Sequence, residues 1–184
     1  MRTQEFVEDV GVKRARSFEQ VYRQNLPSLV AFASRRVGAH DAIEVVAQTF
    51  TIAWRRFDDV PAGAEARLWL FGTARRVMAN ERRSSSRRSA LHDRLRAEWK
   101  PSDETEQRTE ARVAHLDVLA RALHELSAED RELLLLAGLE ELKPAEIAIV
   151  LDVTSDVVRN RLSRARRRLQ KLYETHALRE QEDA

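Results

Sequence analysis

Two runs of basic side chains are the residues in this sequence whose types and spacing suggest chemistry. Between Ser155 and Tyr173 there are seven basic residues and a single acid, Asp156. Between Arg75 and Arg88 there are six arginines and one glutamate. Arginine neutralises phosphates and forms bidentate hydrogen bonds with base edges. Two separate basic runs therefore indicate a polyanion contacted at two places, with a solvated helix face as the alternative.

The run after Ser155 lies in a pattern typical of a helix-turn-helix. The residues Pro144 to Leu151 predict a short helix, because proline suits a first helical turn and Ile147, Ala148 and Leu151 form an apolar inner face. The residues Asp152 to Thr154 predict the turn, in which Asp152 tolerates left-handed geometry, Val153 fills the core, and Thr154 or Ser155 caps the next helix. The inward stripe of that helix is Val158, Leu162, Ala165, Leu169 and Leu172.

The opposite face of this second helix is polar. Residues early in such a helix reach base edges, and later ones meet phosphates, so we expect Arg159 and Asn160 to read bases and Arg164 and Arg167 to hold the backbone. The predicted DNA-binding residues are Thr154, Ser155, Asp156, Arg159, Asn160, Ser163, Arg164 and Arg167. A helical hairpin with a solvated basic face remains the alternative.

The elements that must position these residues are helices. The chain has only 5 Gly and 4 Pro in 184 residues and is rich in helix formers, which predicts an all-α fold. Apolar periodicity predicts helices from Ser17, its N-cap, to Gly38, from about Asp41 to Phe57, and from Ala64 onward. The predicted organisation is a loose tail 1–16, a helical domain 17–84, a flexible linker 85–110, a helix-turn-helix domain 111–174 and a tail 175–184.

Apolar residues at helical spacing predict the cores of both domains. In the second helix the expected stripe is Ile43, Val46, Phe50, Trp54 and Phe57. We expect Trp54 and Phe71 to be core residues, and Trp69 either to be core or to stack on unpaired bases. In the second domain the first stripe is Val113, Leu116, Leu119, Leu123 and Leu126, followed by an approximate capping box formed by Ser127 and Asp130.

Both domains resemble parts of one protein family. The stretch from Leu126 to Arg131, then Glu146-Ile147-Ala148, then Arg161 to Leu169, resembles region 4 of the extracytoplasmic-function (ECF) sigma factors of the sigma-70 family. The stretch from Asp41 to Trp54 looks like region 2.2, and that from Trp69 to Arg83 looks like regions 2.3 and 2.4. The resemblance implies a sigma factor that binds core RNA polymerase and recognises the −10 and −35 elements of promoter DNA. It also admits an anti-sigma factor as a partner.

The resemblance implies roles for residues of the first domain. The loop Asp58 to Glu65 resembles the loop that captures a flipped promoter base, and the arginines after it would hold phosphates. The implied −10 residues are Asp58, Asp59, Ala62, Trp69, Arg75, Arg76, Asn80 and Arg83. The implied polymerase-binding residues are Asp41, Glu44, Val45 and Gln48. Taken alone, these segments are an interhelical turn, a solvated helix end and a polar helix face.

Other function classes find little support in the sequence. There is no cysteine, the five histidines share no metal-ligand spacing, and no glycine-rich phosphate loop or nucleophile–base pair occurs, so we expect neither an enzyme nor a metal or cofactor. No signal peptide or membrane span is predicted, which favours a cytoplasmic protein, and the residues after Tyr173 predict no fused ligand-sensing module. The rival hypotheses are a helix-turn-helix regulator that acts without polymerase and a partner-binding adaptor.

Overall fold

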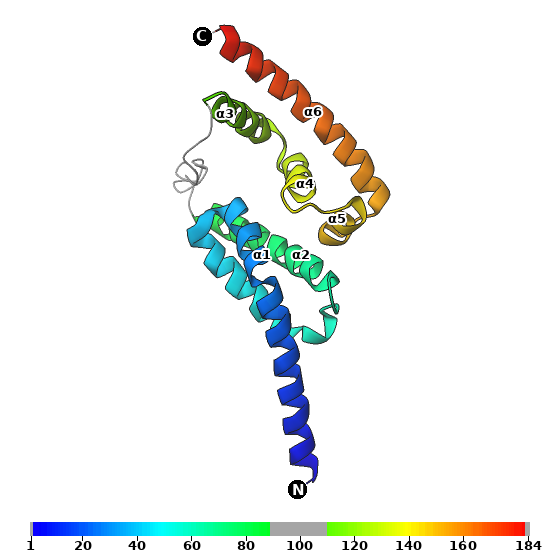
Figure 1. The fold of residues 1–184 in the computed structure, drawn as a ribbon. Helices are drawn as coiled ribbons and strands as arrows, with labels where there is room; N and C mark the ends of the chain where they lie inside the picture. The colour runs from blue at the N-terminus through cyan, green and yellow to red at the C-terminus, as the bar shows by residue number, and fades with distance from the viewer. Residues whose placement is uncertain (1, 89–109, 183–184) are drawn as a thin grey trace. The chain divides into compact units, whose positions relative to one another are not determined.

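The described part of the chain is built from helices joined by short loops and contains no strand. The computed structural model describes residues 2–88 and 110–182, and within them the side chains of residues 12–83 and 115–178. The chain divides into two compact units, Met1–Trp99 and Lys100–Ala184, and Figure 1 shows the helices of each. The predicted all-α class with two helical domains is confirmed. Residues 89–109 of the predicted linker 85–110 lie outside the described residues.

The first unit begins with α1, Arg2–Arg55, which consists of two helices that meet at Gly38. Gly38 has φ 82° and ψ 162°, a conformation that is open almost only to glycine, so the predicted helix end at this residue is confirmed. Ring contacts join Phe18 to Trp54 and Tyr22 to Phe50, with centroids 5.1 and 4.6 Å apart. The two halves of α1 therefore run antiparallel.

The start of α1 differs from the prediction. Residues 1–16 were expected to be a loose tail and Ser17 an N-cap, but the helix begins at Arg2 and Ser17 is an exposed residue inside it. Arg14 lies one turn before Phe18, and both side chains contact the far end of α1. Apolar periodicity did not predict the helical turn before Phe18, because the side chain that makes its contact, Arg14, is charged.

The remaining elements of the first unit are a short 3-10 helix η1, Phe57–Asp59, and α2, Glu65–Arg88, which packs against α1. Phe32 and Phe71 stack with centroids 4.2 Å apart at the centre of this core, and both rings are fully buried. The core prediction is thus confirmed for Phe71. It is wrong for Trp54, which is 43% exposed, while Trp69 is half-buried.

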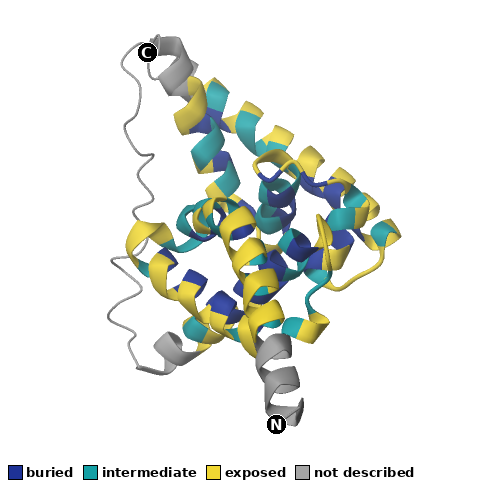
Figure 2. Cartoon of the chain, turned by 60° about the horizontal axis from the view of Figure 1, so that its bottom comes forward, coloured by how far each residue is buried: buried dark blue, intermediate teal, exposed yellow. Residues whose placement is uncertain are grey.

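The second unit contains α3, Glu110–Glu125; α4, Ala128–Gly138; α5, Pro144–Leu151; and α6, Ser155–Glu182. The Ser127 hydroxyl accepts a hydrogen bond from the Asp130 N–H at 3.1 Å, as the predicted cap requires. Val118 and Ala122 of α3 are buried, as is Leu126 directly after it, whereas Leu116 of the predicted stripe is 38% exposed. Buried and exposed residues alternate along α6, as expected for a helix with one side against α4 and α5 (Figure 2).

The last helix continues past the predicted end of the domain. The segment 175–184 was expected to be a tail, but α6 runs to Glu182. His176 is buried against α3, where its Nε2 lies 2.9 Å from a carboxylate oxygen of Glu125, and the Tyr173 hydroxyl lies 2.8 Å from Nδ1 of His115. The end of α6 is held to α3 by polar contacts. The sequence therefore lacks the apolar periodicity that would have predicted a longer helix.

Candidate nucleic-acid interface

The helix-turn-helix is built by α5, the turn Asp152–Thr154 and the start of α6. Asp152 adopts φ 57° and ψ 50°, the predicted left-handed conformation, and the Val153 N–H donates to the Ala148 carbonyl at 3.1 Å. The Thr154 hydroxyl accepts from the Val157 N–H at 3.4 Å and caps α6. Ile147, Ala148 and Val158 are buried where the two helices cross.

Two details of this motif differ from the prediction. Val150 rather than Leu151 is buried on the inner face of α5. Val153 does not fill the core, because its side chain is 38% exposed. The left-handed turn at Asp152 connects α5 to α6 without a buried apolar side chain. Backbone hydrogen bonds stabilise the turn instead.

The outer face of α6 presents the predicted DNA-binding residues together. All of them except the half-buried Ser155 are exposed: Thr154, Asp156, Arg159, Asn160, Ser163, Arg164 and Arg167. Their spacing places Asp156, Asn160, Ser163 and Arg167 along one stripe of the helix. The Asp156 carboxylate pairs with the Arg159 guanidinium, and Arg167 donates to the Ser163 hydroxyl at 3.4 Å.

Two other basic residues of α6 are engaged inside the domain. Arg168 pairs with the carboxylate of Asp130 on α4, and Arg161 lies 3.9 Å from Glu129 of the same helix. These ion pairs hold the recognition helix α6 to the start of α4. Only part of the basic run is therefore directed to an external polyanion, which the count of arginines in the sequence could not reveal.

The first unit places most of the predicted −10 residues on one stripe and its adjoining loop. Trp69, Arg76, Asn80 and Arg83 follow one another at steps of seven, four and three residues along α2 and so share a face. Arg75 is half-buried and lies about 120° away around the helix. The structure therefore separates Arg75 from the other members of the predicted set.

The loop between α1 and α2 is exposed and carries two paired acids. Asp58 lies 3.3 Å from a guanidinium nitrogen of Arg14, and Asp59 lies 2.8 Å from Nε of Arg56. Ala62 is exposed, and Gly63 turns the chain into α2 with φ 68°. The sequence pattern predicted the loop but not its contact with Arg14, because Arg14 and Asp58 are 44 residues apart in the chain.

The predicted polymerase-binding residues form an acidic cluster with one member that the sequence reasoning missed. The Gln48 amide donates to the Glu44 carboxylate at 3.0 Å and to the Glu81 carboxylate at 3.2 Å. Glu81 lies on α2, so only the packing of α2 against α1 brings it to this place. Asp41 is half-buried one turn before Glu44. We call Asp41, Glu44, Gln48 and Glu81 the acidic cluster.

Val45 was predicted among these residues, and the structure corrects this. Its side chain is fully buried, and it belongs to the core between α1 and α2. Residue 45 follows Glu44 by one position, so it points about 100° away from it around the helix. Val45 can support the acidic cluster but cannot contact a partner.

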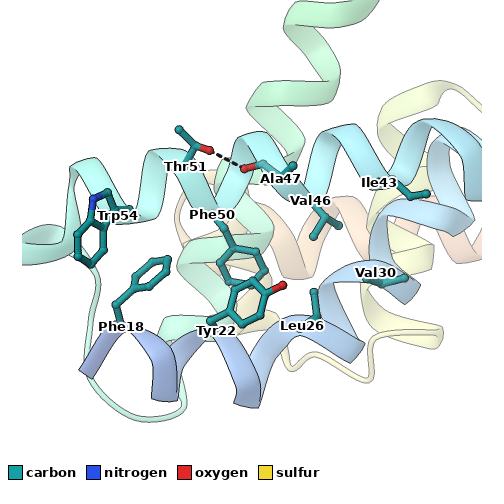
Figure 3. A pocket seen from close by; sticks show the side chains of 10 residues that line it. All are labelled: Phe18, Tyr22, Leu26, Val30, Ile43, Val46, Ala47, Phe50, Thr51 and Trp54. Atoms are coloured by element: carbon teal, nitrogen blue, oxygen red, sulfur yellow. Dashed lines mark hydrogen bonds between the residues drawn. The ribbon is translucent and has the colours of Figure 1, made fainter. Parts of the chain in front are cut away.

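An apolar groove of about 580 Å³ lies between the two halves of α1, next to the acidic cluster (Figure 3). Ile43 is 73% exposed on one of its walls, and Tyr22, Val30 and Trp54 are also exposed. The predicted core stripe of this helix is thus wrong for Ile43 and Trp54. Only Val46 and Phe50 of that stripe are buried, while Phe57 is half-buried.

Within residues 12–83 and 115–178 no three histidine or acidic side chains come together in a way that could hold a metal ion. None of the helices in these two ranges is long and apolar enough to cross a membrane.

Comparisons with known proteins match both units of the chain. The family description "Sigma-70 region 2" matches residues 21–88, and "Sigma-70, region 4" matches residues 116–169. The ECF RNA polymerase sigma factor SigL of Mycobacterium tuberculosis is 30% identical over 165 residues, which are 89% of this chain and 92% of SigL.

Two solved complexes contain chains with a similar fold. The sigma factor RpoE of Bartonella quintana, solved with the anti-sigma factor NepR, has a TM-score of 0.66 and 27% identity over 85% of this chain and 96% of that one. CnrH, solved with the cytosolic domain of CnrY, has a TM-score of 0.58 and 26% identity over 88% and 90% of the two chains. The matched regions lie in the same order as the two units, and this chain belongs to the ECF sigma factors of the sigma-70 family.

Proposed function

We propose that this chain binds core RNA polymerase and directs transcription initiation at specific promoters. The observation that supports this most is that one chain carries both a helix-turn-helix with an exposed polar reading face and a separate region 2 unit with its own polar stripe. Each surface would contact one promoter element. The chain would act by binding alone, and no bond would be made or broken by its side chains.

The second unit would read the −35 element in the major groove. Arg159 and Asn160 lie in the second turn of α6, where side chains of such helices reach base edges. Arginine suits guanine and asparagine suits adenine, because both can form two hydrogen bonds with those bases. Arg164 and Arg167 lie further along and would meet phosphates, which fixes the position of the helix without reading sequence.

The first unit would bind and help to open the −10 element. Arg76 and Arg83 would hold phosphates along the stripe, with Asn80 between them. Trp69 is half-buried on the same face and could stack on an unpaired base, which typically contributes about 1–3 kcal/mol. Asp58, Asp59 and Ala62 would form the loop that accepts a flipped base.

The acidic cluster would bind a basic surface of core polymerase. It presents the carboxylates of Glu44 and Glu81 on either side of the Gln48 amide, so a basic partner side chain could meet both. A helix-turn-helix regulator that acts without polymerase would have no need of this cluster. The match of region 2 over residues 21–88 also favours the sigma factor over that alternative.

We also propose that an anti-sigma factor is a partner, because the structurally similar RpoE was solved with one. The groove of Figure 3 offers a surface for it. Its exposed Ile43 and Trp54 are suited to the apolar side of a partner helix, and burial of such side chains is favourable by about 25 cal/mol per Å².

Transcription in vitro with core polymerase and genomic DNA tests the function. The wild-type chain should produce transcripts from defined start sites, whereas core enzyme alone should not. If the chain binds duplex DNA but adds no start sites, it is a regulator that acts without polymerase.

Charge reversal tests the polymerase surface. The double variant Glu44→Arg and Glu81→Arg should lower the affinity for core polymerase on the order of 10- to 100-fold, because each reversal replaces an attraction by a repulsion. Glu19→Arg is the matched control, since Glu19 is an exposed α1 residue whose ion-pair partner, Arg23, lies one turn away at 2.6 Å. Equal core binding by the double variant would place the polymerase contact elsewhere.

A further inference from the structure

The start of α1 contacts the loop that the proposed function assigns to the −10 element. One guanidinium nitrogen of Arg14 lies 3.3 Å from the Asp58 carboxylate, and the other donates to the Trp54 carbonyl at 3.2 Å. Trp54 lies in the last turn of α1, where helix carbonyls lack partners within the helix. Arg14 therefore joins the end of α1 to the first residues of the loop.

Aromatic contacts reinforce this junction. The Arg14 guanidinium carbon lies 5.8 Å from the centroid of the Trp54 ring and 5.9 Å from that of Phe57. Phe18, one turn later, meets the same two rings edge-on at 5.1 and 5.7 Å, and Figure 3 shows Phe18 opposite Trp54. Arg14 and Phe18 both precede residue 21, where the match to sigma-70 region 2 begins.

The loop's own backbone hydrogen bonds are local. The N–H groups of Asp59, Val60 and Ala66 each donate to the carbonyl three residues earlier, at 2.9, 3.1 and 3.3 Å. Such bonds define turns but do not fix the loop relative to the helices. The bond from Arg14 to Asp58 spans 44 residues and supplies that connection.

We propose that Arg14 is a positioning residue that holds this loop in the conformation that reads the −10 element. The inference rests on the proposed function for the role of the loop. Arginine suits the task because its planar group carries five N–H donors and can serve a carbonyl and a carboxylate at once. A loop that is already ordered loses less conformational entropy when it captures a base.

The first test measures the loop directly, by hydrogen exchange of the full-length chain. Arg14→Ala should speed exchange of the Asp59 and Val60 amides about 3- to 10-fold, as expected for the loss of one partly exposed ion pair with its ring contacts. Arg14→Lys should have an intermediate effect, since an ammonium group does not match the fork of the guanidinium. Arg16→Ala, an exposed residue of the same segment, is the control and should change nothing.

The second test measures promoter choice by the chain with core polymerase. The templates come from a promoter that the wild-type chain uses, randomised in turn across its −10 and −35 windows. Arg14→Ala should weaken base preference in the −10 window about 3- to 10-fold and leave the −35 window unchanged.

The outcomes separate the inference from the proposed function. Unchanged exchange at Asp59 and Val60 in Arg14→Ala overturns the inference, even if transcription falls, because Arg14 would then contact DNA itself. Equal losses in both windows also overturn it, since Arg14 would then serve the fold in general. If the wild-type chain supports no transcription at all, the proposed function fails, while the exchange measurement still decides whether Arg14 holds the loop.

Discussion

The arginines of the recognition helix α6 differ in what they can do, although they look alike in the sequence. Arg161 and Arg168 pair with Glu129 and Asp130 of α4, more than thirty positions earlier in the chain. Arg159 pairs with Asp156 on the reading face itself, where an external base edge could replace or share that partner. These contacts give Arg161 and Arg168 a structural role, and we propose that the arginines of the outer face divide between base reading and phosphate binding.

The first prediction separates base reading from phosphate binding. Arg159→Ala should cost about 1–3 kcal/mol on the correct −35 duplex and little on a scrambled one, because it removes contacts to base edges. Arg167→Ala should weaken binding to both duplexes alike and reduce the salt slope by about one ion. The measurement is a binding titration of the full-length chain with core polymerase on both duplexes at several salt concentrations.

Arg168→Ala serves as the control for this prediction. It should lower the stability of the second domain rather than change base choice, because it leaves the carboxylate of Asp130, which is only 8% exposed, without its partner. If Arg159→Ala and Arg167→Ala behave alike on both duplexes, the assignment of base reading to Arg159 is wrong.

At the scale of the elements, the sequence predicts every α-helix of the described residues but not every boundary, and it does not predict the 3-10 helix η1. Ends that depend on local chemistry were predicted well, as at Gly38, Ser127 and Asp152, since caps and positive φ angles involve neighbouring residues. Ends that depend on distant contacts were missed. The turns around Arg14 and His176 are helical because they meet other elements, which a pattern within one segment does not contain.

The candidate site shows the same division. Outward-facing residues of α6 were predicted from helical periodicity alone, and their exposure confirms the pattern. Glu81 joins the acidic cluster only because α2 packs beside α1. Ile43 looked like a core residue because its spacing fits the apolar stripe, yet it lines an open groove. Periodicity identifies an apolar face, but whether another element covers that face depends on tertiary packing.

The second prediction concerns the junction of the two halves of α1. Gly38→Ala should destabilise the first unit by about 1–3 kcal/mol, because φ 82° with ψ 162° is strained for any residue with a Cβ atom. Gly138→Ala is the matched control. Its Cβ would also meet nothing within 4 Å, but Gly138 ends α4 without a positive φ, so alanine should be neutral or stabilising by up to about 1 kcal/mol.

Urea unfolding of the full-length variants, followed by circular dichroism, measures both changes. Steric crowding plays no part in either position, so backbone conformation is the only difference between the two substitutions. Equal stability changes at Gly38 and Gly138 would mean that the two halves of α1 can meet without a positive φ at residue 38.

At the scale of the whole molecule, specificity comes from two modest surfaces on one chain. Because the net charge of the chain is only +2, its electrostatic attraction to DNA comes from the basic stripes of α2 and α6 and not from the chain as a whole. We propose only a few base-reading side chains on each surface. Two weak contacts on one tether gain affinity because the second binding event becomes intramolecular, with an effective concentration that the connecting segment determines.

The last prediction tests this tether. The sequence predicts a linker at 85–110, and the structure bounds it by the end of α2 at Arg88 and the start of α3 at Glu110. A site-specific protease sequence inserted between these bounds should leave the uncut chain active with core polymerase. Cutting it should lower the affinity of the chain–polymerase complex for a promoter with both elements by about 100- to 10,000-fold, the usual gain from tethering. The loss should be far smaller on a promoter that keeps only one element, which is the internal control. Circular dichroism of the cut sample should show unchanged helix content, because each unit has its own core. If the cut and uncut chains bind the complete promoter equally well, the two surfaces act independently of the tether and the avidity argument fails.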